Sequence, residues 1–134
     1  MHNLEDFVKK WILKADNDLK IAKDEIVTKK PTTDMICFHA QQAVEKYLKA
    51  FLSFKNKKFR RTHDIAELIE LCKEVDDRFK YLYTLSSDEL TAYGVSVRYP
   101  DDFYEPEFDE AERCIDIAEK TKKFIKDIIP ELFC

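Results

Sequence analysis

Apolar residues recur at steps of three or four along most of the chain. One such stripe runs from Phe7 to Ile26, within a helix expected over Leu4 to Thr28, and a second runs from Met35 to Phe51. This spacing places the apolar side chains on one face of a helix. The pattern predicts two long helices separated by Lys29-Lys30-Pro31, and the short connection between them favours antiparallel packing.

The rest of the chain predicts shorter helices. Thr32 or Thr33 can cap the second helix, and Thr62 or Asp64 can cap a third that carries Ile65 to Cys72. A fourth helix is indicated between Phe79 and Tyr93, with a possible restart at Ser86-Ser87-Asp88-Glu89. A last helix begins near Pro106 and ends at Pro130.

Glycine occurs once, at Gly94, so the chain lacks the positions that Rossmann and P-loop phosphate sites require. Residues 93–100 alternate like a strand, but no second strand candidate exists to pair with them, and we interpret them as a helix end and connector. The sequence therefore predicts an all-α antiparallel bundle of four to five helices, as a single domain over residues 1–134.

Charge and cysteine spacing limit the classes of function. The 23 basic and 27 acidic residues give a net charge of −4, so no global positive field attracts nucleic acid or lipid. No signal peptide or membrane span is indicated, and a cytoplasmic protein is expected. The four cysteines lack paired CxxC spacing, which predicts buried thiols and neither a metal site nor a cofactor. They are Cys37, Cys72, Cys114 and Cys134.

Three stretches together resemble the HEPN domain (higher eukaryote and prokaryote nucleotide-binding). They are WILKADNDLKIA from Trp11, CFHAQQAVEKYLKA from Cys37, and Thr62-His63 followed later by Val97-Arg98-Tyr99-Pro100. The second stretch is the most specific, because an amphipathic helix needs only apolar spacing and has no packing reason to carry His-Ala-Gln-Gln.

The resemblance implies a helical bundle that often dimerises and is frequently encoded beside a minimal nucleotidyltransferase in a toxin–antitoxin or related two-component system. Many family members are metal-independent ribonucleases whose motif is an Arg followed, after four to six residues, by a His. Here no His follows His63, and Arg60 and Arg61 precede it too closely to replace the motif. The resemblance then implies the Arg-Tyr-Pro branch, whose members bind nucleotide or act with the nucleotidyltransferase.

The second helix carries a candidate binding row. His39, Gln42 and Lys46 stand at i, i+3 and i+7, so they share one side of the helix and could hold a phosphate or a base edge. The alternative is a network of hydrogen bonds between helices. Asp18 lies close to the apolar stripe of the first helix and needs a cationic or donor partner, for which Lys46, His63 or Arg98 is available.

Further candidates lie at helix ends and in one loop. His63 either donates to an anion or helps to cap a helix, and Arg98 with Tyr99 either contacts a nucleotide or binds helix-terminal carbonyls or an acidic neighbour. The basic loop from Lys55 to Arg61 is either an RNA contact, with Phe59 stacking on a base, or a solvated loop. Its RNA-contact candidates are Lys57, Lys58, Arg60 and Arg61.

The leading hypothesis is a non-catalytic homodimer that binds nucleotide or RNA and acts with a minimal nucleotidyltransferase. The first alternative is a divergent metal-independent ribonuclease toxin that uses Arg98 with His39 or His63. The second is a purely structural interaction module, in which the basic loop and the acidic segment 101–112 are docking patches.

Overall fold

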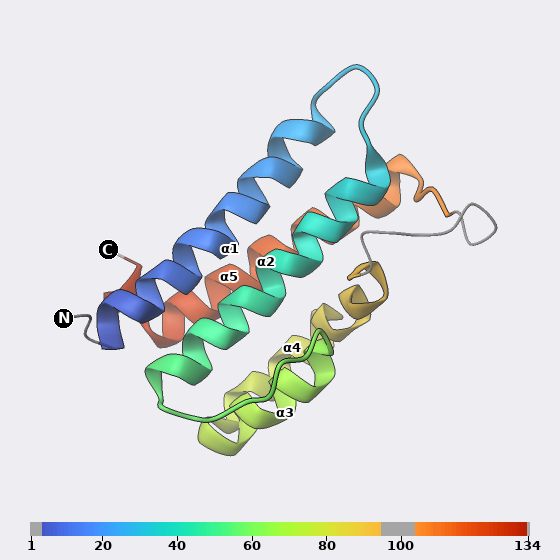
Figure 1. Cartoon of the computed structure of the whole chain (residues 1–134). Coiled ribbons are helices and arrows are strands. Elements are labelled where there is room, and N and C mark those ends of the chain that lie inside the picture. The colour runs from blue at the N-terminus through green and yellow to red at the C-terminus, as the bar shows by residue number, and fades with distance from the viewer. Residues whose placement is uncertain (1–3, 95–103, 134) are drawn as a thin grey trace.

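The computed structural model describes residues 4–94 and 104–133 (Figure 1). The predictions for Arg98, Tyr99 and Cys134 therefore lie outside the described residues, as does most of the predicted connector. Over the described residues the chain is helical and contains no strand, which confirms the all-α class. None of the described helices combines the length and the apolar character needed to cross a membrane.

The two long N-terminal helices lie side by side and antiparallel, as predicted (Figure 1). Helix α1 spans Leu4–Ile26 and helix α2 spans Thr33–Phe54. The turn between them is fastened by Glu25, whose carboxylate accepts a hydrogen bond from the Thr32 backbone N–H at 3.0 Å. Thr32 occupies the N-cap position of α2, but its side chain makes no capping hydrogen bond, so the predicted cap is wrong.

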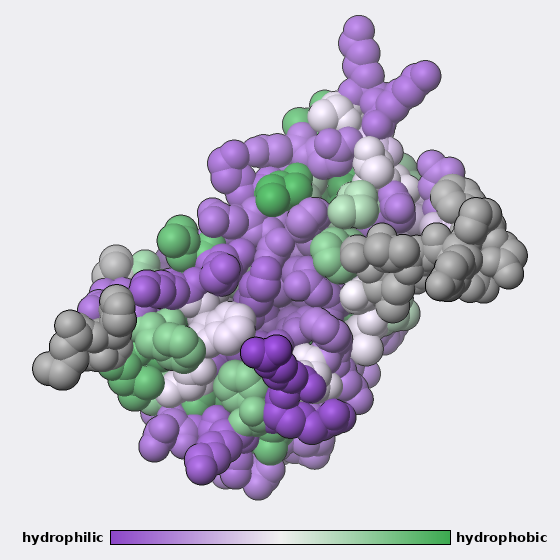
Figure 2. All heavy atoms as spheres, viewed as in Figure 1, coloured by the Kyte–Doolittle hydropathy of each residue, from purple (hydrophilic) through white to green (hydrophobic). Residues whose placement is uncertain are grey.

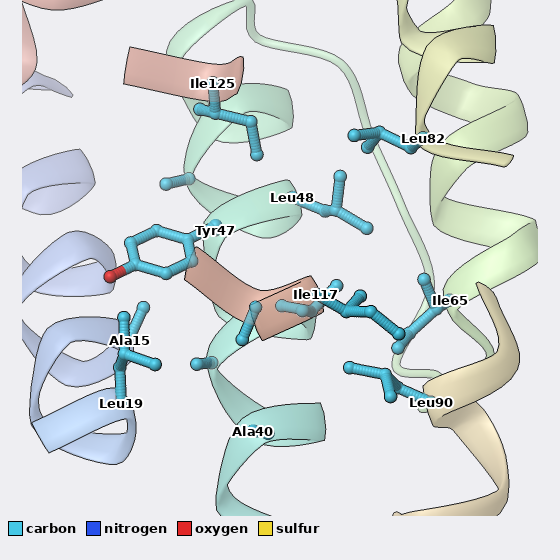
Figure 3. Packing of buried hydrophobic residues seen from close by; sticks show 14 of the residues in the cluster. Ala15, Leu19, Ala40, Tyr47, Leu48, Ile65, Leu82, Leu90, Ile117 and Ile125 are labelled. Carbon is cyan, nitrogen blue, oxygen red and sulfur yellow. The ribbon is translucent and has the colours of Figure 1, made fainter. Parts of the chain in front are cut away.

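Helix α2 is the central element of the bundle. It packs against α1, against α3 (Ile65–Val75) and against α5 (Phe108–Ile128). Figure 3 shows Tyr47 reaching from α2 toward α1, whereas Leu48 points toward Ile65, Leu82 and Leu90. Because α2 has neighbours on several sides, only a narrow strip of it reaches solvent.

The region after α3 differs from the predicted fourth helix. It consists of three short elements, namely the 3-10 helix η1 (Asp77–Lys80), the single turn α4 (Tyr81–Thr84) and the 3-10 helix η2 (Ser87–Tyr93). Asp76 starts η1 by accepting a hydrogen bond from the Arg78 N–H at 3.0 Å. Ser86 has φ of 65°, in the left-handed region, so an α-helix cannot continue through it. The restart after Ser86 is confirmed, in 3-10 form.

Other helix ends follow local hydrogen bonding. Asp64 caps α3 by accepting from the Glu67 N–H at 3.3 Å, as one of the two predicted caps. Helix α5 begins at Phe108, so Pro106 is not its first helical residue, and α5 ends at Ile128 before Pro130 opens the 3-10 helix η4 (Pro130–Leu132). Burial of the cysteine thiols is confirmed at three positions, Cys37, Cys72 and Cys114.

Candidate functional site

Polar side chains line the strip of α2 between α1 and the segment that precedes α3. In Figure 2, which has the same view as Figure 1, hydrophilic residues cover much of the middle of this face. We call this surface the α2 polar face. Its residues are Asp18, His39, Gln41, Gln42, Glu45, Lys46, Lys49 and His63.

Asp18 of α1 holds two side chains of α2. Its Oδ1 lies 2.9 Å from His39 Nδ1, and its Oδ2 accepts a hydrogen bond from Lys46 Nζ at 2.5 Å. The predicted need of Asp18 for a cationic partner is thus met by Lys46. The Asp18 side chain is 10% exposed, whereas those of His39 and Lys46 are 20% and 24% exposed. We call these three residues the Asp18 cluster.

A second carboxylate, Glu45 of α2, organises the other half of the face. It accepts hydrogen bonds from Lys49 Nζ at 2.6 Å and from Gln41 Nε2 at 2.9 Å, and His63 Nδ1 lies 2.9 Å from its Oε1. The Glu45 side chain is only 3% exposed, whereas that of His63 is 74% exposed. We call these four residues the Glu45 cluster.

The structure divides the predicted row of His39, Gln42 and Lys46. His39 and Lys46 turn to Asp18, whereas Gln42 Nε2 donates to Gln41 Oε1 at 2.6 Å and to Glu45 at 3.4 Å. Three consecutive turns of α2 therefore distribute their polar groups between two carboxylates. His63 contacts Glu45 and does not cap α3, whose cap is Asp64.

Sequence reasoning missed Gln41, Glu45 and Lys49. They are spaced at i, i+4 and i+8 among buried alanines and valine, so a polar row inside an apolar helix was the available signal. Lys49 Nζ also lies 5.7 Å from the centroid of the Trp11 ring, which gives this buried ammonium a second favourable contact.

The only glycine of the chain packs against the Glu45 cluster. A Cβ added at Gly94 would meet Gln41 Cδ and Nε2 at 3.2 Å and the Thr91 carbonyl oxygen at the same distance. A glycine therefore allows the end of η2 to approach the Gln41 amide closely. The backbone of this residue has φ of −74°, so no left-handed conformation is involved.

A pocket of about 180 Å³ opens beside the Asp18 cluster, between α1 and the first turns of α2. Its walls are mainly apolar, and His39 belongs both to the pocket and to the cluster. A hydrogen bond from the Thr32 backbone N–H lowers the pKa of Glu25, which keeps a carboxylate at the rim. The lining residues are Ile21, Ala22, Glu25, Thr32, Met35, Ile36 and His39.

The basic loop is partly neutralised by carboxylates of α3. Arg60 donates two hydrogen bonds to Glu67, at 2.9 and 2.6 Å, and Lys57 Nζ pairs with Glu74 at 3.2 Å. Lys58 and Arg61 are exposed and have no ion pair within the described part of the chain. Two of the four predicted RNA contacts are therefore already engaged by acidic side chains.

Both histidines of the α2 polar face have the same hydrogen-bonding arrangement. An ionised carboxylate only accepts hydrogen bonds, so Nδ1 of each ring carries the donated proton and Nε2 is left for another partner. Across residues 4–94 and 104–133, no three His, Cys, Asp or Glu side chains are placed to hold a metal ion together.

Comparison with known proteins identifies the family. The model of the HEPN domain matches residues 8–128, which is most of the chain and includes both carboxylate clusters. The chain belongs to the HEPN domain family. The resemblance in the α1, α2 and Thr62-His63 segments is thereby confirmed.

Two relatives agree with this assignment. A Methanocaldococcus jannaschii protein named "Putative toxin MJ1304" is 29% identical, and the match covers 95% of this chain and 91% of that protein. The crystal structure of ST0689, described as an archaeal HEPN homologue, superposes with a TM-score of 0.70 at 26% identity. The match covers 91% of this chain and 97% of the ST0689 chain. The helical architecture is thus that of a solved HEPN homologue.

Proposed function

We propose that this HEPN protein is a non-catalytic homodimer that binds a nucleotide or RNA on the α2 polar face and acts with a minimal nucleotidyltransferase. The family match and the toxin-named relative support a role in nucleotide or RNA biology. The sequence supports the non-catalytic part, because no histidine follows Arg98 at the spacing of the family's ribonuclease motif.

The position of His39 carries the ligand-binding part of this proposal. Its ring lines a mainly apolar pocket, and the same ring shares Asp18 with Lys46. A nucleotide combines a flat base with an anionic phosphate, and small-molecule sites typically pair apolar walls with a few polar groups. The pocket suits the base, and Lys46 with His39 Nε2 suits the phosphate or ribose.

The charge of the Asp18 cluster fits reversible binding. Asp18 already neutralises Lys46, so the cluster gains a net charge of +1 only when His39 is protonated. A phosphate must then compete with Asp18 for Lys46, which limits affinity. We expect dissociation constants in the micromolar range or weaker, on the order of 8 kcal/mol or less of binding free energy.

Isothermal titration calorimetry with ATP, UTP and short oligonucleotides tests this proposal. Lys46→Met removes the cation beside the pocket and is expected to weaken binding about tenfold to a hundredfold, the usual worth of one charge-assisted hydrogen bond. Lys20→Met is the matched control, because Lys20 pairs with Asp24 on the exposed side of α1. If none of the probes binds to the wild-type protein, the ligand-binding proposal is wrong.

The nucleotidyltransferase partner is tested separately by co-expression with the reading frame next to this gene. Co-purification of the two chains and a defined stoichiometry by light scattering would support the partnership. The same light-scattering measurement on this chain alone tests the homodimer. If this chain is a monomer and does not co-purify with the neighbouring protein, the homodimer and the nucleotidyltransferase partnership are both refuted.

A second candidate function is metal-independent ribonuclease activity, favoured by the two carboxylate-bound histidines. Asp18 and Glu45 each orient one imidazole, and a general base with a general acid is the minimum that RNA cleavage requires. Cleavage of RNA in EDTA that is lost in both His39→Ala and His63→Ala would establish this candidate and refute the non-catalytic proposal.

A further inference from the structure

A groove with an excess of lysines runs between α1 and α5, away from the α2 polar face. Two hollows of about 250 and 280 Å³ lie along these helices, and they share Lys122 and Lys126. The two hollows are therefore neighbours, and we call them together the α1–α5 groove. The hollows have no lining residue in common with the pocket beside His39.

The groove is locally positive on a chain whose net charge is −4. Five lysines and two carboxylates line it, a local charge of +3 that falls to +2 when Glu5, which pairs with Lys9 at 3.2 Å, is included. The carboxylates are already occupied, since Asp16 pairs with Lys122 at 2.9 Å and Glu119 pairs with Lys23 at 3.0 Å. Lys123 and Lys126 have no ion pair among the residues that the structure describes.

The charges are arranged in a line. Lys9 and Lys23 lie fourteen residues apart on α1, about 21 Å at 1.5 Å per residue, and the lysines of α5 face the stretch between them. A single phosphate or nucleotide needs cations that converge on one point. Cations spaced along a groove instead match a linear polyanion with regularly spaced charges.

We propose that the α1–α5 groove binds the phosphate backbone of single-stranded RNA. Lysines are flexible point charges that follow a backbone without reading sequence. The groove also contains Leu13, which is 59% exposed, and Phe133, whose ring is half-buried against Tyr47 and leaves part of its surface for contact with an unpaired base. This apolar surface favours a strand with accessible bases over an acidic peptide.

The salt dependence of RNA binding tests this assignment. Fluorescence anisotropy with a labelled oligouridylate, over a series of KCl concentrations, gives the slope of log Kobs against log salt. Each phosphate contact on a single strand contributes about 0.7 to that slope. Lys123→Gln with Lys126→Gln is therefore expected to reduce the magnitude of the slope by about 1.4.

The matched control is Lys10→Gln with Lys120→Gln, which changes the net charge equally on the same two helices but outside the groove. The control is expected to keep the wild-type slope. The proposal is overturned if both double variants lower the slope equally, if neither does, or if polyglutamate binds to the protein and the oligouridylate does not.

The groove and the α2 polar face can fail independently. Lys46→Met lies outside the groove and is expected to weaken mononucleotide binding, whereas the drop of about 1.4 in the salt slope caused by Lys123→Gln with Lys126→Gln is expected to be the same with and without it. If the wild-type protein binds no mononucleotide, only the pocket proposal is refuted. If the groove double variant keeps the wild-type salt slope, only the proposal of RNA binding in the α1–α5 groove is refuted.

Discussion

The Asp18 cluster and the Glu45 cluster are built from the same chemical parts but differ in burial. Each has one carboxylate, one lysine and one histidine bonded through Nδ1. In the Asp18 cluster all three side chains are between 10% and 24% exposed. In the Glu45 cluster the carboxylate is almost sealed at 3%, while its histidine, His63, is largely in water.

This difference separates a binding arrangement from a structural one. Water or a ligand can replace Asp18 at His39 and Lys46, because each of them already reaches solvent. Glu45 cannot exchange partners in the same way, since Lys49 and Gln41 are buried around it and a charge left unpaired there would be costly. We therefore expect Glu45 to determine stability and the Asp18 cluster to determine binding.

Removal of the buried Glu45 carboxylate is expected to have the largest effect on stability. Glu45→Ala leaves the Lys49 ammonium without its partner at a buried position, and we expect a loss of about 3–5 kcal/mol in the free energy of unfolding. Urea denaturation followed by circular dichroism at neutral pH measures this. A loss under about 1 kcal/mol would show that water reaches Lys49 and that the two clusters do not differ.

The matched control replaces both Glu45 and Lys49, which form the ion pair, instead of Glu45 alone. Glu45→Leu combined with Lys49→Met removes both charges and keeps the volume, and buried ion pairs exchanged in this way are often neutral or stabilising. We expect the double variant to recover most of the stability lost in Glu45→Ala. No recovery would mean that the cost arises from Gln41 and His63, the remaining partners of Glu45.

Removing the partly exposed carboxylate has a smaller expected effect. Asp18→Ala takes the acceptor from His39 and Lys46, but both side chains can turn to water, so we expect a loss of about 1–3 kcal/mol. The same urea titration measures it. Asp24→Ala, on the exposed side of α1 and paired with Lys20, is the control and is expected to cost about 0.5 kcal/mol or less.

The sequence could predict the long helices because their period and their end signals agree. Leu4 begins α1 as predicted, and Pro130 follows directly after α5. The fourth helix was predicted only in part, because the restart at Ser86 is confirmed but η1 and η2 are 3-10 helices and α4 is a single turn. Apolar spacing does not distinguish a short 3-10 helix from an α-helix.

The candidate site was predictable only where a polar residue stood in an apolar stripe. Asp18 met that condition, and Lys46 was among its expected partners. Glu45 also stands among apolar residues of α2, but whether that side of the helix is buried depends on where α3 and η2 pack, which is a tertiary property. His63 was recognised as polar at a helix start, but its contact with Glu45 joins residues 18 positions apart.

Tyr47 provides a further polar contact of α2 with α1. Its ionisation makes the stability of the fold depend on pH, which adds a second measure of how buried polar groups of α2 contribute to stability. Its buried hydroxyl donates to Asp16, and burial together with that carboxylate raises the pKa of Tyr47 above its usual value near 10. Above that pH the unfolded chain loses a proton that the folded chain keeps. The stability therefore falls as pH rises, by about 1.4 kcal/mol per pH unit for each such tyrosine.

Tyr47→Phe removes this contribution. At neutral pH we expect a loss of about 1 kcal/mol, the worth of one hydrogen bond. In urea titrations between pH 10 and 11, where the unfolded tyrosine is only partly ionised, the decline of stability with pH is expected to be shallower by about 1 kcal/mol per unit than in the wild type. Tyr81→Phe, which removes an exposed phenol, is the control, and an equal change in both variants would contradict the assignment to Tyr47.

The smallest expected effect on stability comes from His63, although it bonds the most buried carboxylate of the face. Its side chain is 74% exposed, and Glu45 retains Lys49 and Gln41 when the imidazole is removed, so His63→Ala is expected to change stability by less than about 0.5 kcal/mol. His39→Ala is the matched variant on the other carboxylate. Because the His39 ring fills part of the pocket wall, its removal is expected to weaken nucleotide binding in calorimetry more than that of His63. A His63 variant that loses more stability than the His39 variant would reverse the comparison, since the exposed ring would then be what keeps Glu45 in place.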